Sequence, residues 1–162
     1  MSLWVTNASP LIFLAKLDRL PLLRSAASKI FVPTTVIEEI AAQKDSAFER
    51  VDAALRSWLD RREPIVGERI HLLGLEVGLG EAAAIALGIE ARADRIVLDD
   101  LDARRWAQRL GLRPIGTLGI LLAARLRGEL PSLEAEIDRL TEAGFRIGDA
   151  LMNAVLKEAG ER

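Results

Sequence analysis

Short apolar runs separated by helical segments are the feature that most limits the folds open to this chain. Runs at residues 3–6, 29–32, 95–98 and 113–115 have the length and composition of buried strands, and helix-like segments lie between them. Strands that alternate with helices favour a parallel sheet with both faces covered. The sequence therefore predicts a three-layer α/β/α sandwich built on a short parallel sheet.

Capping residues indicate where several helices begin. Ser9 and Pro10 have the pattern of an N-cap followed by the first helical residue. Thr34 or Thr35 is suited to cap the helix that follows the second strand, and Asp102 is suited to cap the helix after the strand at 95–98.

Periodicity assigns the remaining segments. Apolar residues recur at helical spacing from 47 to 61, which predicts one amphipathic helix there, whereas 63–69 is predicted to be mostly loop. Further helices are predicted at residues 20–27, 36–42, 81–91, 103–110, 118–127, 133–143 and 149–159. A length of 162 residues suits one domain. We expect a single domain over 1–162, with its core at 3–130 and extra C-terminal helices at 131–162.

The composition excludes several kinds of chemistry. The chain has no cysteine, so disulfides, thiolate nucleophiles and zinc–sulfur sites are excluded. The single histidine, His71, disfavours a Ser-His-Asp triad. With 22 basic and 24 acidic side chains, the chain lacks the positive charge that grips duplex DNA indiscriminately. Carboxylates, hydroxyls, amides and basic side chains are left to carry any reaction.

Neither a membrane span nor a secretory signal is indicated. No apolar run approaches the roughly 20 residues that a span needs. The first residues, MSLWVTNASP, lack the basic and apolar regions of a signal peptide. We expect a cytoplasmic protein that does not associate with membranes.

Acidic and amide residues follow the predicted strands. The carboxyl ends of parallel strands share one edge of a sheet, where ligands bind. Carboxylates that converge there repel one another unless a cation lies among them, and oxygen ligands without His or Cys favour Mg²⁺ or Mn²⁺. The residues in question are Asn7, Glu38, Glu39, Glu81, Asp99 and Asp100.

Each of these residues also has a structural explanation. Glu81 suits the first turn of its helix, where it complements the helix dipole. Glu38 and Glu39 are about 100° apart on a helix, so only one faces a given site. Asp99 and Asp100 point to opposite sides if their strand continues. The sequence leaves both choices open.

Five segments, in this order, resemble the PIN-domain superfamily, and most closely a prokaryotic branch known as a domain of unknown function. The segments are VTNASPLIFLAKL, VPTTVIEEI, GLGEAAAIAL, RIVLDDLDARRWAQRLGL and PIGTLGILLAARLRGEL. They cover Val5 to about Leu130, and the final segment, ending in GFRIGDALMNAVLKEAGE, is similar to the C-terminal helices of that branch. The resemblance implies a Mg²⁺- or Mn²⁺-dependent ribonuclease that acts on single-stranded RNA. Many relatives are toxins of toxin–antitoxin pairs, similar to the VapC type.

The resemblance also implies roles for particular residues. It matches the acidic positions of the family to Asn7, Glu39, Glu81 and either Asp99 or Asp100, with Asp100 preferred. The implied catalytic residues are Glu39, Glu81, Asp99 and Asp100, and the implied metal ligands are Asn7, Glu81 and Asp100. Ser9 matches the small hydroxyl residue after the first acid and is expected to bind a ligand water or the phosphate.

Two arginines follow the acidic end of the strand at 95–98. Arg104 and Arg105 are expected to steer the RNA backbone, and an exposed helix face is the alternative explanation for them.

Asn7 is the main departure from the pattern, because it places a neutral amide where the family has an acid. An amide oxygen can bind Mg²⁺, but the site loses one negative charge. The alternative is therefore a degenerate, non-catalytic PIN module that binds RNA or a protein partner.

A nucleotide-binding enzyme is a weaker alternative. Residues 78–83, GLGEAA, match the loose form G-x-G-x-x-A, and Asp99 and Asp100 follow about 20 residues later. Glu81 would repel a pyrophosphate in that loop, and the chain is short for such a fold with a substrate domain.

The resemblance implies three partners. These are single-stranded RNA, a small antitoxin-like protein, and a second copy of the chain in a homodimer.

Overall fold

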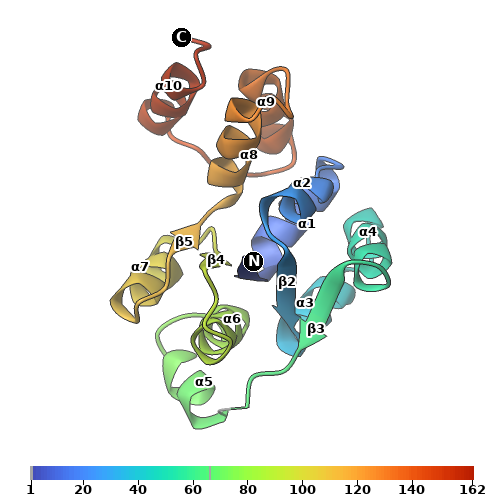
Figure 1. Cartoon of the computed structure of the whole chain (residues 1–162), viewed down its shortest axis with the longest axis vertical. Helices are drawn as coiled ribbons and strands as arrows, with labels where there is room; N and C mark the ends of the chain where they lie inside the picture. The colour runs from blue at the N-terminus through green and yellow to red at the C-terminus, as the bar shows by residue number, and fades with distance from the viewer. Residues whose placement is uncertain (1, 66) are drawn as a thin grey trace.

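The computed structural model describes residues 2–65 and 67–162. Within this part, the strands form one five-stranded sheet in the order β3-β2-β1-β4-β5, and every neighbouring pair is parallel (Figure 1). The strands are β1 (Leu3–Thr6), β2 (Lys29–Pro33), β3 (Leu59–Arg62), β4 (Arg95–Val97) and β5 (Pro114–Ile115). The predicted parallel sheet is confirmed.

Helices cover both faces of the sheet. The first are α1 (Ala8–Lys16), α2 (Pro21–Ala26), α3 (Thr34–Gln43), α4 (Ser46–Leu55) and α5 (Gly67–Leu73). The others are α6 (Leu79–Glu90), α7 (Leu101–Arg109), α8 (Thr117–Leu126), α9 (Leu133–Glu142) and α10 (Asp149–Glu158).

Alternation along the central strands divides the core into two clusters. Trp4 and Val97 pack with α1, α2, α4 and the C-terminal helices on one face. Val5 and Ile96 pack with α6 and α7 on the other face. Side chains of a strand point alternately to opposite faces, so neighbouring residues enter different clusters. The predicted three-layer sandwich follows from this division.

The segment 47–61 corrects one prediction, because only its first part is helical. Helix α4 ends at Leu55, and Leu59 begins the edge strand β3, where it pairs with Ile30 and is 2 % exposed. The same spacing of apolar residues also arises when a helix ends and a buried strand follows it. Local periodicity does not distinguish these two cases. Part of the predicted loop at 63–69 is also helical, since α5 begins at Gly67.

Three predicted helix caps are also corrected. Asn7, not Ser9, is the N-cap of α1, although its side chain makes no capping bond. At α3 the N-cap is Pro33, whereas the prediction gave this role to Thr34 or Thr35. At α7 the cap is Asp100, whose carboxylate accepts a hydrogen bond from the backbone N–H of Ala103. Each of these helices begins slightly earlier than predicted, and only at α7 does the strand before it also end earlier than predicted, at Val97.

The C-terminal helices are fastened by two carboxylates. Glu161 accepts hydrogen bonds from the backbone N–H groups of Leu133 and Glu134 at the start of α9. Glu136 is 3 % exposed and binds both Arg19 and Arg139. These contacts tie α9 to the chain end and to the residues after α1. Among the described residues, no helix is long and apolar enough to cross a membrane.

Candidate functional site

The carboxyl ends of β1 and β4 lie next to each other and position the first two polar groups of the site. Thr6 is paired with Val97, and the backbone N–H of Asn7 donates to the carbonyl oxygen of Val97 over 3.0 Å. Asn7 follows β1 directly, and Asp99 lies two residues after β4. Asn7 and Asp99 therefore lie at the ends of adjacent strands, on the edge of the sheet predicted to hold the site.

The Asp99 carboxylate is held by three donors. The backbone N–H of Thr117 donates to Oδ1 over 2.7 Å, and the hydroxyl of Thr117 donates to Oδ2 over 2.7 Å. The hydroxyl of Ser9 donates to Oδ2 over 3.0 Å. Donors that point at an ionised carboxylate make strong, short bonds and fix its orientation. Asp99 is therefore a rigid anion between β1, β4 and the start of α8.

Asp100 has a different position and a different partner. Its side chain is exposed and caps α7 through the 2.9 Å bond from Ala103. Asp102 is also exposed and forms an ion pair with Arg105 over 3.4 Å. Of the two aspartates, Asp99 is the one whose carboxylate contacts Ser9 and Thr117.

Asn7 contains an unusual polar atom. Its side chain is 4 % exposed, and its Oδ1 atom is buried with no hydrogen-bond partner among the described residues. A buried acceptor without a partner costs about 1–3 kcal/mol. Such a cost is expected where a ligand completes the bonding.

Glu39 and Glu81 form a second group at the beginning of α6. The carboxylate of Glu39 lies so close to Gly80 that a Cβ atom there would overlap it. The carboxylate of Glu81 occupies the corresponding space beside Gly78, the N-cap of α6. Two glycines thus make room for two carboxylates at one helix end. Glu38 and Glu39 are both exposed residues, and Glu39 is the one whose carboxylate lies against Gly80.

The electrostatics of this pair are unfavourable for two ionised groups. Burial around the carboxyl group of Glu39 raises its pKa, and the nearby charge of Glu81 raises that pKa further. A backbone hydrogen bond from Gly80 opposes the rise. Two carboxylates that share a place favour either a shared proton or a cation between them.

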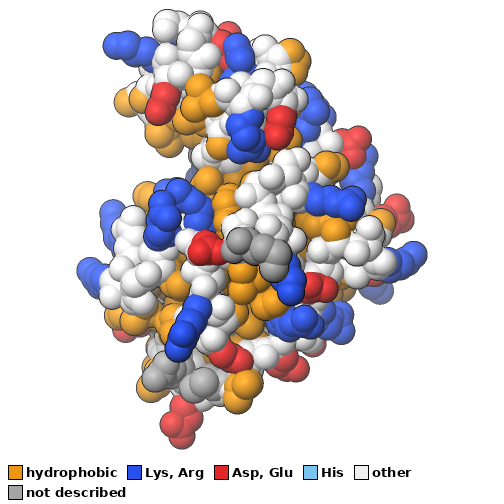
Figure 2. All heavy atoms as spheres, in the orientation of Figure 1, with side chains coloured by type: hydrophobic (Ala, Val, Ile, Leu, Met, Phe, Trp, Pro, Cys, Tyr) orange, Lys and Arg blue, Asp and Glu red, His pale blue; other side chains and the backbone are white. Residues whose placement is uncertain are grey.

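Arg104 approaches the Asp99 side of the site. Both its Nη1 atom and Oδ1 of Asp99 lie just over 3 Å from the place that a Cβ atom of Gly116 would take. Arg105 is exposed and points to Asp102 instead. Figure 2 shows Lys and Arg side chains gathered over α7, beside the hollow between that helix and the C-terminal helices. Of the two predicted arginines, Arg104 is the one that reaches the site.

Oxygen donors make the site suitable for a hard divalent cation. Within the described residues, no group of three or more His, Cys, Asp or Glu side chains stands close enough together to hold a metal ion. The carboxylates are divided instead between Asp99 and the Glu39–Glu81 pair. The amide oxygen of Asn7, at the end of the neighbouring strand β1, is an additional oxygen ligand, and it has no hydrogen-bond partner among the described residues. Oxygen ligands of this kind fit Mg²⁺ or Mn²⁺.

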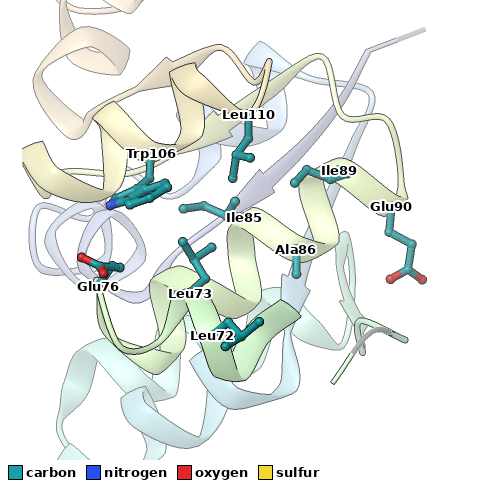
Figure 3. Close-up of a pocket in the computed structure, with 9 residues that line it drawn as sticks. All are labelled: Leu72, Leu73, Glu76, Ile85, Ala86, Ile89, Glu90, Trp106 and Leu110. Carbon is teal, nitrogen blue, oxygen red and sulfur yellow. The ribbon is translucent and has the colours of Figure 1, made fainter. Parts of the chain in front are cut away.

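A large apolar cavity lies elsewhere, between α5, α6 and α7 (Figure 3). Its volume is about 710 Å³, and its walls include Ile85, Ile89 and Trp106. Glu76 and Glu90 lie at its rim, and Glu90 accepts a hydrogen bond from the backbone N–H of Ile65. The cavity lacks the converging polar groups that the strand ends provide, so we place the candidate site at the strand ends.

Sequence reasoning missed two features of the site. Thr117 binds Asp99 twice, although no role is predicted for it from the sequence. Gly78 and Gly80 enter the sequence analysis only as part of the loose nucleotide-binding pattern, whereas in the structure they leave space for the two glutamates. The signal for Thr117 was its place at the first position of a helix directly after a short strand.

The nucleotide-binding alternative is not supported by the loop at 78–83. A nucleotide fingerprint follows a strand, whereas α5 precedes this loop. The start of α6 also has the carboxylate of Glu39 against Gly80, where a phosphate would need to bind.

A comparison with protein families identifies the fold independently. A family model described as a PIN domain matches residues 3–161. No curated protein matches the chain. PIN domains generally use divalent metal ions, often bind RNA and often have toxin–antitoxin partners. The chain therefore belongs to the PIN-domain family, which has a fold of nuclease type.

Proposed function

We propose that this protein is a Mg²⁺- or Mn²⁺-dependent ribonuclease that cleaves single-stranded RNA. The proposal depends on two groups at neighbouring strand ends: the Asp99 carboxylate, held by three hydrogen bonds, and the buried Oδ1 of Asn7, which has no partner among the described residues. The amide of Asn7 and the fixed carboxylate of Asp99 are suited to bind a cation, and that cation would in turn bind a phosphodiester.

Each group has a role in this proposal. Asp99 and Asn7 hold the cation, and Glu81 and Glu39 complete its surroundings or accept a proton from the attacking water. A bound divalent cation would polarise the phosphoryl oxygen and acidify a water. Arg104 faces the phosphate, for which a guanidinium is well shaped.

Our proposal assigns to Asp99 the role that the resemblance gave first to Asp100. The carboxylate of Asp100 caps the start of α7 by accepting a hydrogen bond there. Ser9, expected to contact the substrate, already donates its hydroxyl to Asp99. We therefore propose Ser9 as a support of Asp99, and Arg105 as an outer contact for RNA at most.

Metal-dependent cleavage of a labelled single-stranded RNA tests the proposal. The wild-type protein is expected to cleave with Mn²⁺ and to stop when the metal is chelated. Glu81→Gln should lose most activity, whereas Glu38→Gln, at an exposed neighbouring position, should retain it. Equal cleavage by both variants would indicate a contaminating nuclease and contradict the proposal.

Asn7 supports a second candidate, a PIN module that binds RNA without cleaving it. Its amide removes one charge from the site, and no group of three carboxylates stands together among the described residues. Asn7→Asp distinguishes the two functions. Cleavage that appears only in this variant would favour the non-catalytic module.

We also propose that the protein acts as a toxin with a small antitoxin-like partner and forms a homodimer, as many PIN domains have such partners. Expression in a host cell should arrest growth, and co-expression of the adjacent reading frame should relieve the arrest. Harmless expression of a protein that is active in vitro would contradict the toxin role.

A further inference from the structure

We propose that Thr117 is a positioning residue of the site: its backbone N–H and its hydroxyl hold both oxygens of Asp99 in the orientation in which this carboxylate binds a divalent cation. The inference rests on the proposed function for the identity of the cation. The contacts themselves do not depend on that function.

The contacts of Thr117 and Asp99 form a two-point clamp. The N–H of Thr117 reaches Oδ1 and its hydroxyl reaches Oδ2, each over 2.7 Å. When both oxygens of a carboxylate accept hydrogen bonds, the group cannot rotate about its Cβ–Cγ bond without breaking one of those hydrogen bonds. Ser9, in α1, adds a longer bond to Oδ2, over 3.0 Å.

Burial strengthens this clamp. Thr117 is 0 % exposed, so water does not compete for its hydroxyl. A hydrogen bond in such surroundings is electrostatically stronger than one in water. An ionised carboxylate offers about four acceptor positions, so three donors leave room for one further ligand, which suits a cation.

The position of Thr117 explains why its N–H is free to bind Asp99. Thr117 is the first residue of α8, and Gly116 is the N-cap in an extended conformation. The first N–H groups of a helix have no partner inside the helix, and the positive end of the helix dipole favours an anion there. Asp99, 18 residues earlier, supplies that anion.

The hydroxyl has a purpose beyond starting the helix. Any residue except proline would offer its N–H to Asp99 at this position, but only Thr or Ser offers an aliphatic hydroxyl as well. The acceptor of that hydroxyl is Oδ2 of Asp99. Side chains that orient a metal ligand in this manner typically change metal affinity by about 10–100-fold when they are removed.

Mn²⁺ binding to the full-length protein, measured by calorimetry or electron paramagnetic resonance, tests the inference. Thr117→Val keeps the backbone N–H and nearly the same volume but removes the hydroxyl, and should weaken Mn²⁺ binding about tenfold or more. Thr117→Ser restores the hydroxyl and should bind Mn²⁺ nearly as the wild type does. Thr141→Val, at an exposed position on α9, is the matched control and should leave binding unchanged.

A second readout separates positioning from a general loss of structure. If Thr117 acts through the cation, the RNA cleavage rate of Thr117→Val should recover as Mn²⁺ is raised, with the melting temperature near that of Thr117→Ser. Recovery that requires more Mn²⁺ than the wild type needs would support the inference.

The outcomes for the inference and for the proposed function differ. Wild-type and Thr117→Val proteins that bind Mn²⁺ equally would overturn the inference and leave the ribonuclease standing. Weaker Mn²⁺ binding by Thr117→Val, in a protein that cleaves no RNA, would support the clamp and contradict the ribonuclease. Absence of Mn²⁺ binding to the wild-type protein would overturn the clamp as well.

Discussion

The two carboxylate groups at this edge of the sheet are built in opposite ways. Asp99 is surrounded by donors: Thr117 donates to both of its oxygens, and Ser9 donates to Oδ2. Glu39 and Glu81 face each other with one backbone donor to Glu39, and the pKa of Glu39 is raised by burial and by the charge of Glu81. One group fixes an anion in place, whereas the other keeps two anions that repel each other. Asp99 would provide a divalent cation with a ligand of fixed orientation. The same cation would reduce the repulsion between Glu39 and Glu81.

The largest effect is expected from neutralising the fixed anion. Asp99→Asn should reduce Mn²⁺ affinity and RNA cleavage by at least the ~100-fold that loss of a supporting residue can cause. Asp100→Asn is a matched control, because Asn is as good an N-cap as Asp and should preserve α7. Calorimetry with Mn²⁺ and an RNA cleavage assay would check both variants. Equal losses in the two would contradict the assignment of Asp99.

Crowding the paired carboxylates should have a smaller effect. Gly80→Ala places a Cβ atom where the carboxylate of Glu39 lies, so this carboxylate must leave its position beside Gly80. We expect a few-fold loss of Mn²⁺ affinity with the fold retained. Gly148→Ala has open space for its Cβ and serves as the control. Unchanged Mn²⁺ binding by Gly80→Ala would remove the glutamate pair from the cation site.

The raised pKa of Glu39 predicts a pH-dependent stability. A carboxyl group whose pKa is higher in the folded state favours folding when protonated, so its contribution is lost as pH rises from about 4.5, its ordinary value, through the raised value. Glu39→Gln should therefore melt at a higher temperature than the wild type at neutral pH. The difference should vanish below the ordinary pKa. Melting curves across this range without metal would check it, and a constant difference would contradict the shift.

The smallest effect on the site is expected from the C-terminal fastening. Glu161→Ala removes the acceptor for two N–H groups at the start of α9 and should lower the free energy of unfolding by ~1 kcal/mol, as loss of a helix cap does. Mn²⁺ affinity should stay unchanged. Denaturant unfolding would measure the first effect, and a large loss of Mn²⁺ affinity would show that the C-terminal helices support the site.

The sheet could be predicted from the sequence because the strands at its centre are buried on both faces. Residues such as Val5 and Ile96 lie in apolar runs that are recognisable in the sequence. The edge strand β3 could not be predicted from the sequence, because its LDRR sequence is mostly charged. Its one apolar residue, Leu59, continues the helical pattern of the preceding segment. Its pairing with β2 depends on a distant segment.

The candidate site was predicted in part for a similar reason. The position of Asn7 and Asp99 follows from parallel strands, which any alternation of strands and helices implies. The choice between Asp99 and Asp100 depends on where β4 stops and α7 starts, a matter of a single residue. The donors to Asp99 come from Ser9 and Thr117, which are distant in sequence, so no local pattern reveals them.

A crystal structure of the protein soaked in Mn²⁺, with anomalous diffraction to locate the ion, tests the central claim most directly. Our account predicts a peak within about 2.1–2.3 Å of an oxygen of Asp99 and of Oδ1 of Asn7, distances usual for such cations. A peak bound to Asp100 at the start of α7, or no peak at the ends of β1 and β4, would contradict it.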